Sequence, residues 1–112
     1  MKTSFNYKSK RINLDVKSCN VVERAIGLMF KKREKARALL FDFKKPVSIS
    51  IHSFFVFFPF IAVWLDNKNK VVDIKRIKPF ILAVKPKKSF TKIVEIPINK
   101  TYEGDINLLD DI

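Results

Sequence analysis

The sequence predicts a mainly β domain: an antiparallel sandwich or barrel with one α-helix near residues 21–32. Apolar residues alternate with polar ones, or cluster, in seven or eight short runs of strand length separated by turn and proline signals. Only one segment has helical spacing, so the chain lacks the crossover helices that parallel strand pairs require, and antiparallel pairing follows. At 112 residues, the chain is expected to form a single domain over residues 1–112.

The N-terminal part supplies a first strand and the helix. Apolar residues alternate with polar ones near 11–17, which predicts a strand. Asn20 is a typical helix N-cap, and Glu23 follows at the spacing of a capping box. The helix over 21–32 would carry one apolar stripe, formed by Val22, Ala25, Ile26, Met29 and Phe30. Gly27 costs a helix about 1 kcal/mol relative to alanine, so its presence favours a close approach by another backbone.

The central stretch, Pro46–Leu65, holds most of the apolar residues and has His52 as its only titratable side chain. Its length of about 20 residues and its flanking lysines would suit a transmembrane helix. Alternation just after Pro46, the abundance of phenylalanine and valine, and Pro59, which would cost a helix about 3 kcal/mol, all argue against a span. We therefore predict two strands of a soluble domain, about 47–57 and 60–66, joined at Phe58-Pro59.

The other strands are expected at Ala38–Phe43, Val71–Ile77, Phe90–Ile96 and, as a short segment closing the sheet, Ile106–Ile112. Asp66–Lys70 is a turn that would make a hairpin. Eight of the eleven phenylalanines lie in 30–60, and we interpret them as core residues rather than as bases for nucleic-acid stacking. The expected core includes Leu28, Met29, Phe54, Val56, Phe58, Val63 and Leu65.

The charge is strongly basic, with 23 basic and 11 acidic residues and a net charge of +12. Such an excess attracts polyanions of any kind, including nucleic acid, anionic lipid and acidic protein. The candidate contacts are two basic runs, which could equally be solvated surface: Lys31, Lys32, Arg33, Lys85, Lys87 and Lys88.

The single cysteine, Cys19, excludes an internal disulfide, and no metal-ligand spacing or glycine-rich phosphate loop is present. No cofactor or metal is expected. The polar, basic first ten residues do not resemble a signal peptide, which predicts a cytoplasmic protein.

Several short blocks occur in an order that points to a known family. They are Glu23–Phe30, Leu39-Leu40-Phe41, Ile51–Val56 followed by Phe58-Pro59 and Val63–Asp66, Lys78-Pro79-Phe80, and Val94–Pro97. Together they resemble the DUF192 family, also called UPF0127. The resemblance implies a small, mostly β, jelly-roll-like domain and brings no established activity. The chain departs from the family pattern at Phe57, where a basic residue is usual, at Ile61, where an aspartate is usual, and at Leu109, where a glycine is usual.

Four polar residues are candidates for a ligand site. His52 and Ser53 adjoin each other in the central stretch, Arg24 lies on the predicted helix, and Asp66 follows a predicted strand. The sequence favours a non-enzymatic module that binds an unknown ligand or protein partner. Three alternatives remain: a polyanion binder that uses the lysine-rich loops, an enzyme that pairs His52 with a carboxylate such as Asp66 or Asp42, and a membrane-associated protein.

Overall fold

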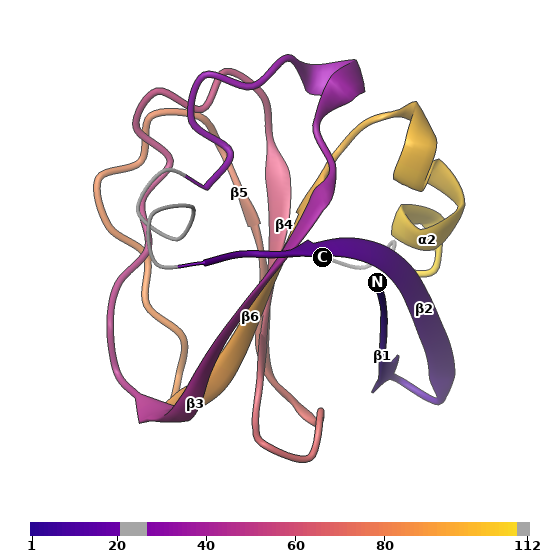
Figure 1. Cartoon of the computed structure of the whole chain (residues 1–112), viewed down its shortest axis with the longest axis vertical. Helices are drawn as coiled ribbons and strands as arrows, with labels where there is room; N and C mark the ends of the chain where they lie inside the picture. The colour runs from indigo at the N-terminus through magenta and orange to yellow at the C-terminus, as the bar shows by residue number, and fades with distance from the viewer. Residues whose placement is uncertain (21–26, 110–112) are drawn as a thin grey trace.

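The computed structural model describes residues 1–20 and 27–109 and shows a mainly β protein. Its six strands form one curled sheet, a half-barrel, in the order β1-β2-β3-β6-β4-β5 (Figure 1). One short α-helix, α2 (Glu103–Asn107), lies among the described residues beside β2. The strands are β1 (Lys2–Tyr7), β2 (Lys10–Ser18), β3 (Ala38–Val47), β4 (Phe60–Leu65), β5 (Val71–Ile77) and β6 (Phe90–Pro97).

The pairing is antiparallel between all neighbours except β2 and β3, which run parallel where Val16 faces Ala38. In Figure 1, β2 crosses the view at a steep angle to the central strands, so the sheet curls towards α2. β4 is buried at all six positions, as expected for a continuously apolar strand in the middle of a sheet. The hairpin of β4 and β5, predicted from the turn at Asp66–Lys70, is confirmed.

The sheet buries both of its faces, because alternate residues of each strand point to opposite sides. One core contains Ile61 and Val63 of β4 together with Val94 and Ile96 of β6. The other core contains the intervening residues of the same strands and their neighbours, among them Phe41, Ala62, Trp64 and Ile93. The candidate site described below lies on this second face.

The predicted strand over 47–57 is wrong. β3 ends at Val47, and the following segment is irregular except for one bridge between Ile51 and Val84. Ile49 is 44% exposed, so the alternation after Pro46 does not mark a half-buried strand. Phe55 has a φ of 61°, a left-handed conformation that a strand cannot contain.

The two ends of the chain also differ from expectation. β1 pairs with β2 but was not predicted, because its polar residues hide the period of two. The predicted strand at Ile106–Ile112 is wrong for the residues described, since this region forms α2 and a turn. Ile106 and Leu109, three residues apart, both pack on the first core, which suits a helical turn.

The first half of the helix predicted near 21–32, residues 21–26, lies outside the described part of the chain, and its second half, residues 27–32, is not helical. Residues 27–30 form a turn, and a three-residue 3-10 helix, η1 (Arg33–Lys35), follows. Gly27 has a φ of 55°, a left-handed conformation that glycine adopts without steric cost. No helix in 1–20 or 27–109 is long and apolar enough to cross a membrane.

Candidate functional site

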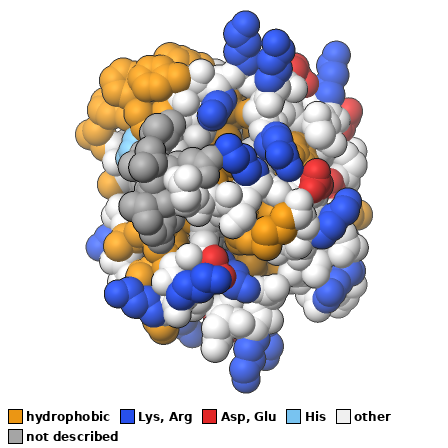
Figure 2. Space-filling model, in the orientation of Figure 1, with side chains coloured by type: hydrophobic (Ala, Val, Ile, Leu, Met, Phe, Trp, Pro, Cys, Tyr) orange, Lys and Arg blue, Asp and Glu red, His pale blue; other side chains and the backbone are white. Residues whose placement is uncertain are grey.

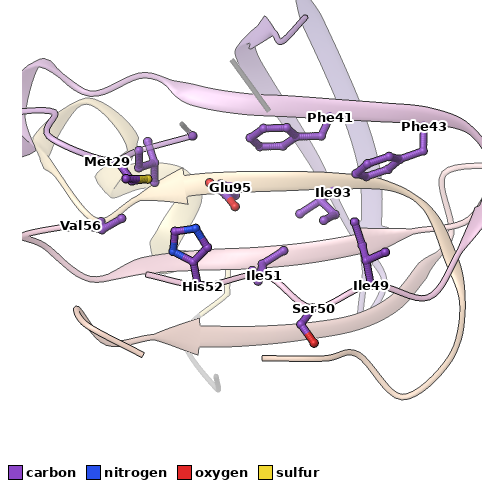
Figure 3. Close-up of a pocket in the computed structure, with 12 residues that line it drawn as sticks. Met29, Phe41, Phe43, Ile49, Ser50, Ile51, His52, Val56, Ile93 and Glu95 are labelled. Atoms are coloured by element: carbon purple, nitrogen blue, oxygen red, sulfur yellow. The ribbon is translucent and has the colours of Figure 1, made fainter. Parts of the chain in front are cut away.

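A pocket of about 330 Å³ opens beside the second face of the sheet (Figure 3). Phe41 and Phe43 of β3 and Ile93 of β6 form its apolar wall. The turn at 27–29 and the irregular segment at 49–56 supply the other sides. The lining is therefore mostly hydrophobic, with few polar groups, which is typical of small-molecule sites.

Glu95 is the buried polar group of this pocket. It lies on β6 opposite Leu39 of β3 and Ala62 of β4, so its cross-strand neighbours are apolar. The residue is 7% exposed, and desolvation by burial is the one cause that shifts its pKa, with no hydrogen bond from the described residues contributing. Burial raises the pKa of Glu95 from 4.5 to about 8, because desolvation penalises the charged form. At neutral pH the carboxyl is therefore mainly protonated.

Gly27 leaves this carboxyl open to the pocket. A Cβ added at Gly27 would lie 3.4 Å from an oxygen of Glu95 and 3.9 Å from the ring of Phe41. The sequence predicted a close approach at this glycine, and the neighbours are these two side chains rather than another backbone. Any larger residue at position 27 would fill space next to the carboxyl and would be strained at its positive φ.

His52 lies at the exposed rim of the same pocket. Its Nδ1 accepts a hydrogen bond from the backbone N–H of Phe54 at 3.2 Å. This bond leaves Nε2 as the ring atom available to a ligand. In Figure 3 the imidazole points from its loop towards the side of the pocket where Glu95 lies. The structure thus places one predicted site residue beside a carboxylic acid that sequence reasoning did not select.

Ser53 is fully buried and holds two backbone groups. Its hydroxyl donates to the carbonyl of Lys78 at 2.6 Å and accepts from the N–H of Ile81 at 2.7 Å. Both bonds join the loop after the central bridge to the loop after β5. Ser53 therefore contributes loop geometry, and it does not line the pocket.

The other two predicted ligand residues do not join His52. Asp66 accepts hydrogen bonds from the backbone N–H groups of Lys68 and Lys70 at 2.8 and 2.9 Å, which shapes the β4–β5 turn. These bonds lower the pKa of the Asp66 carboxyl. Arg24 lies outside the described residues. Asp42, the other carboxylate considered as a partner for His52, bonds the N–H of Lys44 at 2.9 Å and does not line the pocket.

The positions that depart from the family pattern are also separate from the pocket. Phe57 is 58% exposed on the surface, and Ile61 is fully buried in the first core. Neither residue lines the cavity. The apolar residues at these positions therefore replace none of the polar side chains that line the pocket, which are Ser50, His52 and Glu95.

The six basic residues predicted to contact polyanions are all exposed. Arg33 uses its Nε to bond the carbonyl of Ile98 at 2.7 Å. Lys31 lines a second hollow of about 200 Å³ on the other side of the turn at Gly27, together with Lys17, Lys35 and Arg37. In the view of Figure 2, lysines and arginines are spread over the face rather than gathered in one band.

Within the described residues, no group of three or more His, Cys, Asp or Glu side chains could hold a metal ion. The polar side chains that line the pocket are Ser50, His52 and Glu95, which can form hydrogen bonds with a ligand. A sequence signal for Glu95 did exist, because it is the one charged residue in the otherwise apolar run from Ile93 to Ile98. The role of Glu95 as a candidate ligand contact depends on the burial of its carboxyl, and the apolar run in the sequence does not by itself show that burial.

The family model for DUF192, described as "Uncharacterized ACR", matches residues 3–111. A UPF0127 protein of Pyrococcus horikoshii is 34% identical over 76 residues, which are 68% of this chain and 65%, or slightly less than two thirds, of that protein. A crystal structure of a Novosphingobium aromaticivorans protein of unknown function aligns over 93% of this chain and 76% of its own, with 14% identity and a TM-score of 0.73.

A Sinorhizobium meliloti protein, described as a candidate transcription regulator, aligns over 96% of this chain and 82% of its own, with 16% identity and a TM-score of 0.76. At these identities the two crystal structures show the fold alone. The family match over almost the whole chain and the archaeal relative agree with the blocks seen in the sequence. The chain belongs to the DUF192, or UPF0127, family of uncharacterised proteins.

Proposed function

We propose that this protein is a non-enzymatic binding module whose pocket takes a small, mainly apolar molecule bearing one polar group. The observation that carries the proposal is the carboxyl of Glu95, which is buried at an apolar pocket without a hydrogen bond from the described residues. A buried polar group without a partner costs about 1–3 kcal/mol. A ligand that supplies the missing partner recovers that free energy when it binds.

The protonation state of Glu95 limits the choice of polar group. With a pKa of about 8, the carboxyl can donate a hydrogen bond to a carbonyl or hydroxyl oxygen at neutral pH. A basic amine could instead take the proton and form an ion pair, although the net charge of +12 disfavours the approach of cations. We therefore favour a neutral oxygen acceptor on an apolar body. The volume of about 330 Å³ suits a compact molecule.

A fragment screen by nuclear magnetic resonance tests this proposal on the whole, isotopically labelled chain. Neutral fragments with an apolar ring and one carbonyl or hydroxyl should shift the backbone amides of Met29, Ile93 and Glu95. The Glu95→Met variant keeps a similar side-chain size but removes the hydrogen-bond donor, and we expect about tenfold weaker binding. Glu103→Met, on exposed α2 outside the pocket, is the matched control and should bind as the original chain does.

Two outcomes would contradict this proposal. One is a screen in which no fragment of this class shifts the pocket amides. The other is a fragment that binds in the pocket with the same affinity in the Glu95→Met variant. Fragments that shift only the amide of Phe57 would be binding on the exposed surface, and they would not support the pocket as the site.

A second candidate function is an enzyme that uses His52 together with Glu95. The specific observation is that both titratable groups line one pocket and that the pKa of Glu95 is strongly raised, which is common among catalytic acids and bases. We do not expect a reaction that depends on His52, because Ser50, the one hydroxyl among the described pocket residues, points away from His52 and Glu95 in Figure 3 and so lacks an activating base. A loss of ~100-fold or more in turnover in His52→Ala, with ligand affinity unchanged, would instead establish general acid or base catalysis.

A further inference from the structure

An exposed cluster of phenylalanines covers one end of the molecule. It comprises Phe30, Phe54, Phe55, Phe57 and Phe80, together with the neighbouring Ile81 and Leu82, and we call it the aromatic patch. Its phenylalanines are 41–65% exposed, and Leu82 is 71% exposed. Figure 2 shows hydrophobic side chains gathered at the upper left, next to the histidine. Contiguous apolar surface of this kind usually marks an interaction site.

The patch is built from three loops that hold one another. Phe30 stacks on Phe55 with ring centroids 5.3 Å apart, and Phe57 meets the edge of Phe80 at 5.5 Å. The N–H of Phe30 also donates to the carbonyl of Phe55 at 2.9 Å, and the N–H of Phe80 donates to the carbonyl of Ser53 at 2.9 Å. Together with the two bonds of the Ser53 hydroxyl, these contacts fix the rings at the surface.

The backbone beneath the patch is strained. Phe30, Phe55 and Phe80 have φ values of 60°, 61° and 63°. A bulky residue in this left-handed region is an outlier that persists only where surrounding contacts impose it, and such outliers gather at functional sites. Here the strain keeps apolar rings exposed, which the hydrophobic effect by itself opposes.

The loops that carry the patch bear mostly positive charge, and Glu34 is the one acidic residue in them among the described residues. Lys31 and Lys32 directly follow Phe30, and Lys78 and Lys85 flank the segment from Phe80 to Leu82. Residues 27–33, 44–65 and 74–90 contain no aspartate or glutamate. All four of these lysines are exposed. The patch is therefore an apolar surface whose loops carry four exposed lysines close to it in the sequence.

We propose that the aromatic patch docks this protein on the surface of an anionic lipid bilayer. Phenylalanine rings and Leu82 would enter the boundary between headgroups and acyl chains, while the flanking lysines contact anionic headgroups. This proposal is independent of the ligand pocket, because none of the seven patch residues lines it. It also differs from a transmembrane span, since only loops would enter the interface.

The charge distribution argues against a second copy as the occupant. Each chain carries a net charge of +12 and has lysines next to the patch in the sequence, so two copies would repel one another. Single-stranded nucleic acid fits less well than lipid, because base stacking needs free ring faces. In this patch Phe30 and Phe55 already stack on each other, and the most exposed residue, Leu82, is aliphatic.

Vesicle co-sedimentation of the whole chain tests the proposal. One set of vesicles is phosphatidylcholine alone, and the other contains ~30% phosphatidylserine at ~0.1 M salt. We expect binding to the second set only. The double variant Phe57→Ser and Leu82→Ser should bind at least about tenfold more weakly, because two exposed apolar side chains no longer enter the interface. The matched control is Leu108→Ser, an exposed leucine on the C-terminal side of α2.

A second pair of variants separates charge from apolar contact. Lys31→Gln with Lys32→Gln should lower the affinity for anionic vesicles about fivefold for each lysine removed. Lys8→Gln with Lys68→Gln removes the same charge beside the β4–β5 turn, at the opposite end of β5 from Phe80, and should have a much smaller effect. Circular dichroism of every variant checks that the fold is retained.

Four outcomes would overturn the proposal. The first is no binding to anionic vesicles, and the second is equal binding to both kinds of vesicle. The third is undiminished binding of the double variant Phe57→Ser and Leu82→Ser to anionic vesicles. That result would show that the net positive charge alone attracts the protein to the vesicles. The fourth is evidence for a different occupant. This would be self-association in sedimentation experiments, or tight binding of a single-stranded oligonucleotide. In either case the same double variant would abolish that interaction and leave vesicle binding unaffected.

Discussion

Ionisation of Glu95 should make the stability of this protein fall as the pH rises through neutrality. In the folded chain the carboxyl keeps its proton until about pH 8, whereas in the unfolded chain it releases the proton near 4.5. Between these values the folded state binds more protons than the unfolded state. The free energy of unfolding attributable to Glu95 is therefore largest below pH 4.5 and decreases as the pH approaches 8.

The magnitude follows from the two pKa values. Each pH unit between 4.5 and about 8 lowers the free energy of unfolding by about 1.4 kcal/mol. The whole interval removes about 5 kcal/mol, which is a large part of the ~5–15 kcal/mol typical of a folded domain. A ligand whose neutral oxygen accepts a hydrogen bond from Glu95 would favour the protonated form and so shift this loss to higher pH.

Urea unfolding of the original chain and of Glu95→Gln, at pH values from below 4.5 to above 8, measures the effect. The glutamine does not titrate, so subtracting its profile removes the contributions of other groups, including His52 at the rim of the pocket. We expect the difference between the two proteins to change by several kcal/mol over this range, with the original chain losing stability relative to the variant. Parallel profiles for the two proteins would refute the assignment of a buried, protonated carboxyl.

Three further predictions concern stability and can be measured by urea unfolding at one pH. Ser53→Ala should cost about 2–4 kcal/mol, because it leaves two backbone groups of the patch loops without their hydrogen bonds; an unchanged unfolding midpoint would show that water replaces the hydroxyl. Phe58→Ala should cost about 3–5 kcal/mol, whereas Phe57→Ala should cost less than ~1 kcal/mol, because these neighbours are 2% and 58% exposed; equal losses would contradict the exposure of the patch. Tyr102→Phe should cost about 1–3 kcal/mol, because its hydroxyl accepts from the buried N–H of Ala38 at 2.8 Å; no loss would mean that this bond contributes nothing.

The sequence correctly predicted the elements that are revealed by a pattern among neighbouring residues. The alternation near 11–17, the hairpin around Asp66–Lys70 and the strand before Pro97 all correspond to observed strands. The expected core is also mostly correct, since Leu28, Val56, Phe58, Val63 and Leu65 are buried. Phe54 is the exception at 41% exposed, and Met29 is partly buried. The resemblance to DUF192 was likewise carried by short blocks of sequence and is confirmed.

The errors occur where the chain folds against distant segments. A continuous apolar run does not reveal which of its phenylalanines face the core, and loop bonds at Ser53 turn several of them outwards. For the same reason the sequence suggested a ligand role for Ser53, whose hydroxyl is occupied by backbone groups 25 and 28 residues away. A hydrogen bond between segments so far apart has no periodic signature in the chain.

The sequence by itself determined a basic, mainly β member of a recognisable family, because strand alternation, turn residues and net charge are properties of neighbouring residues or of their sum. Only the tertiary structure decided where the candidate site lies. Glu95 becomes a buried acid because β3 and β4 place Leu39 and Ala62 on either side of it, and because Gly27 leaves its carboxyl uncovered. The pKa of a carboxyl depends on what surrounds it in space, and that environment is assembled from segments far apart in the chain.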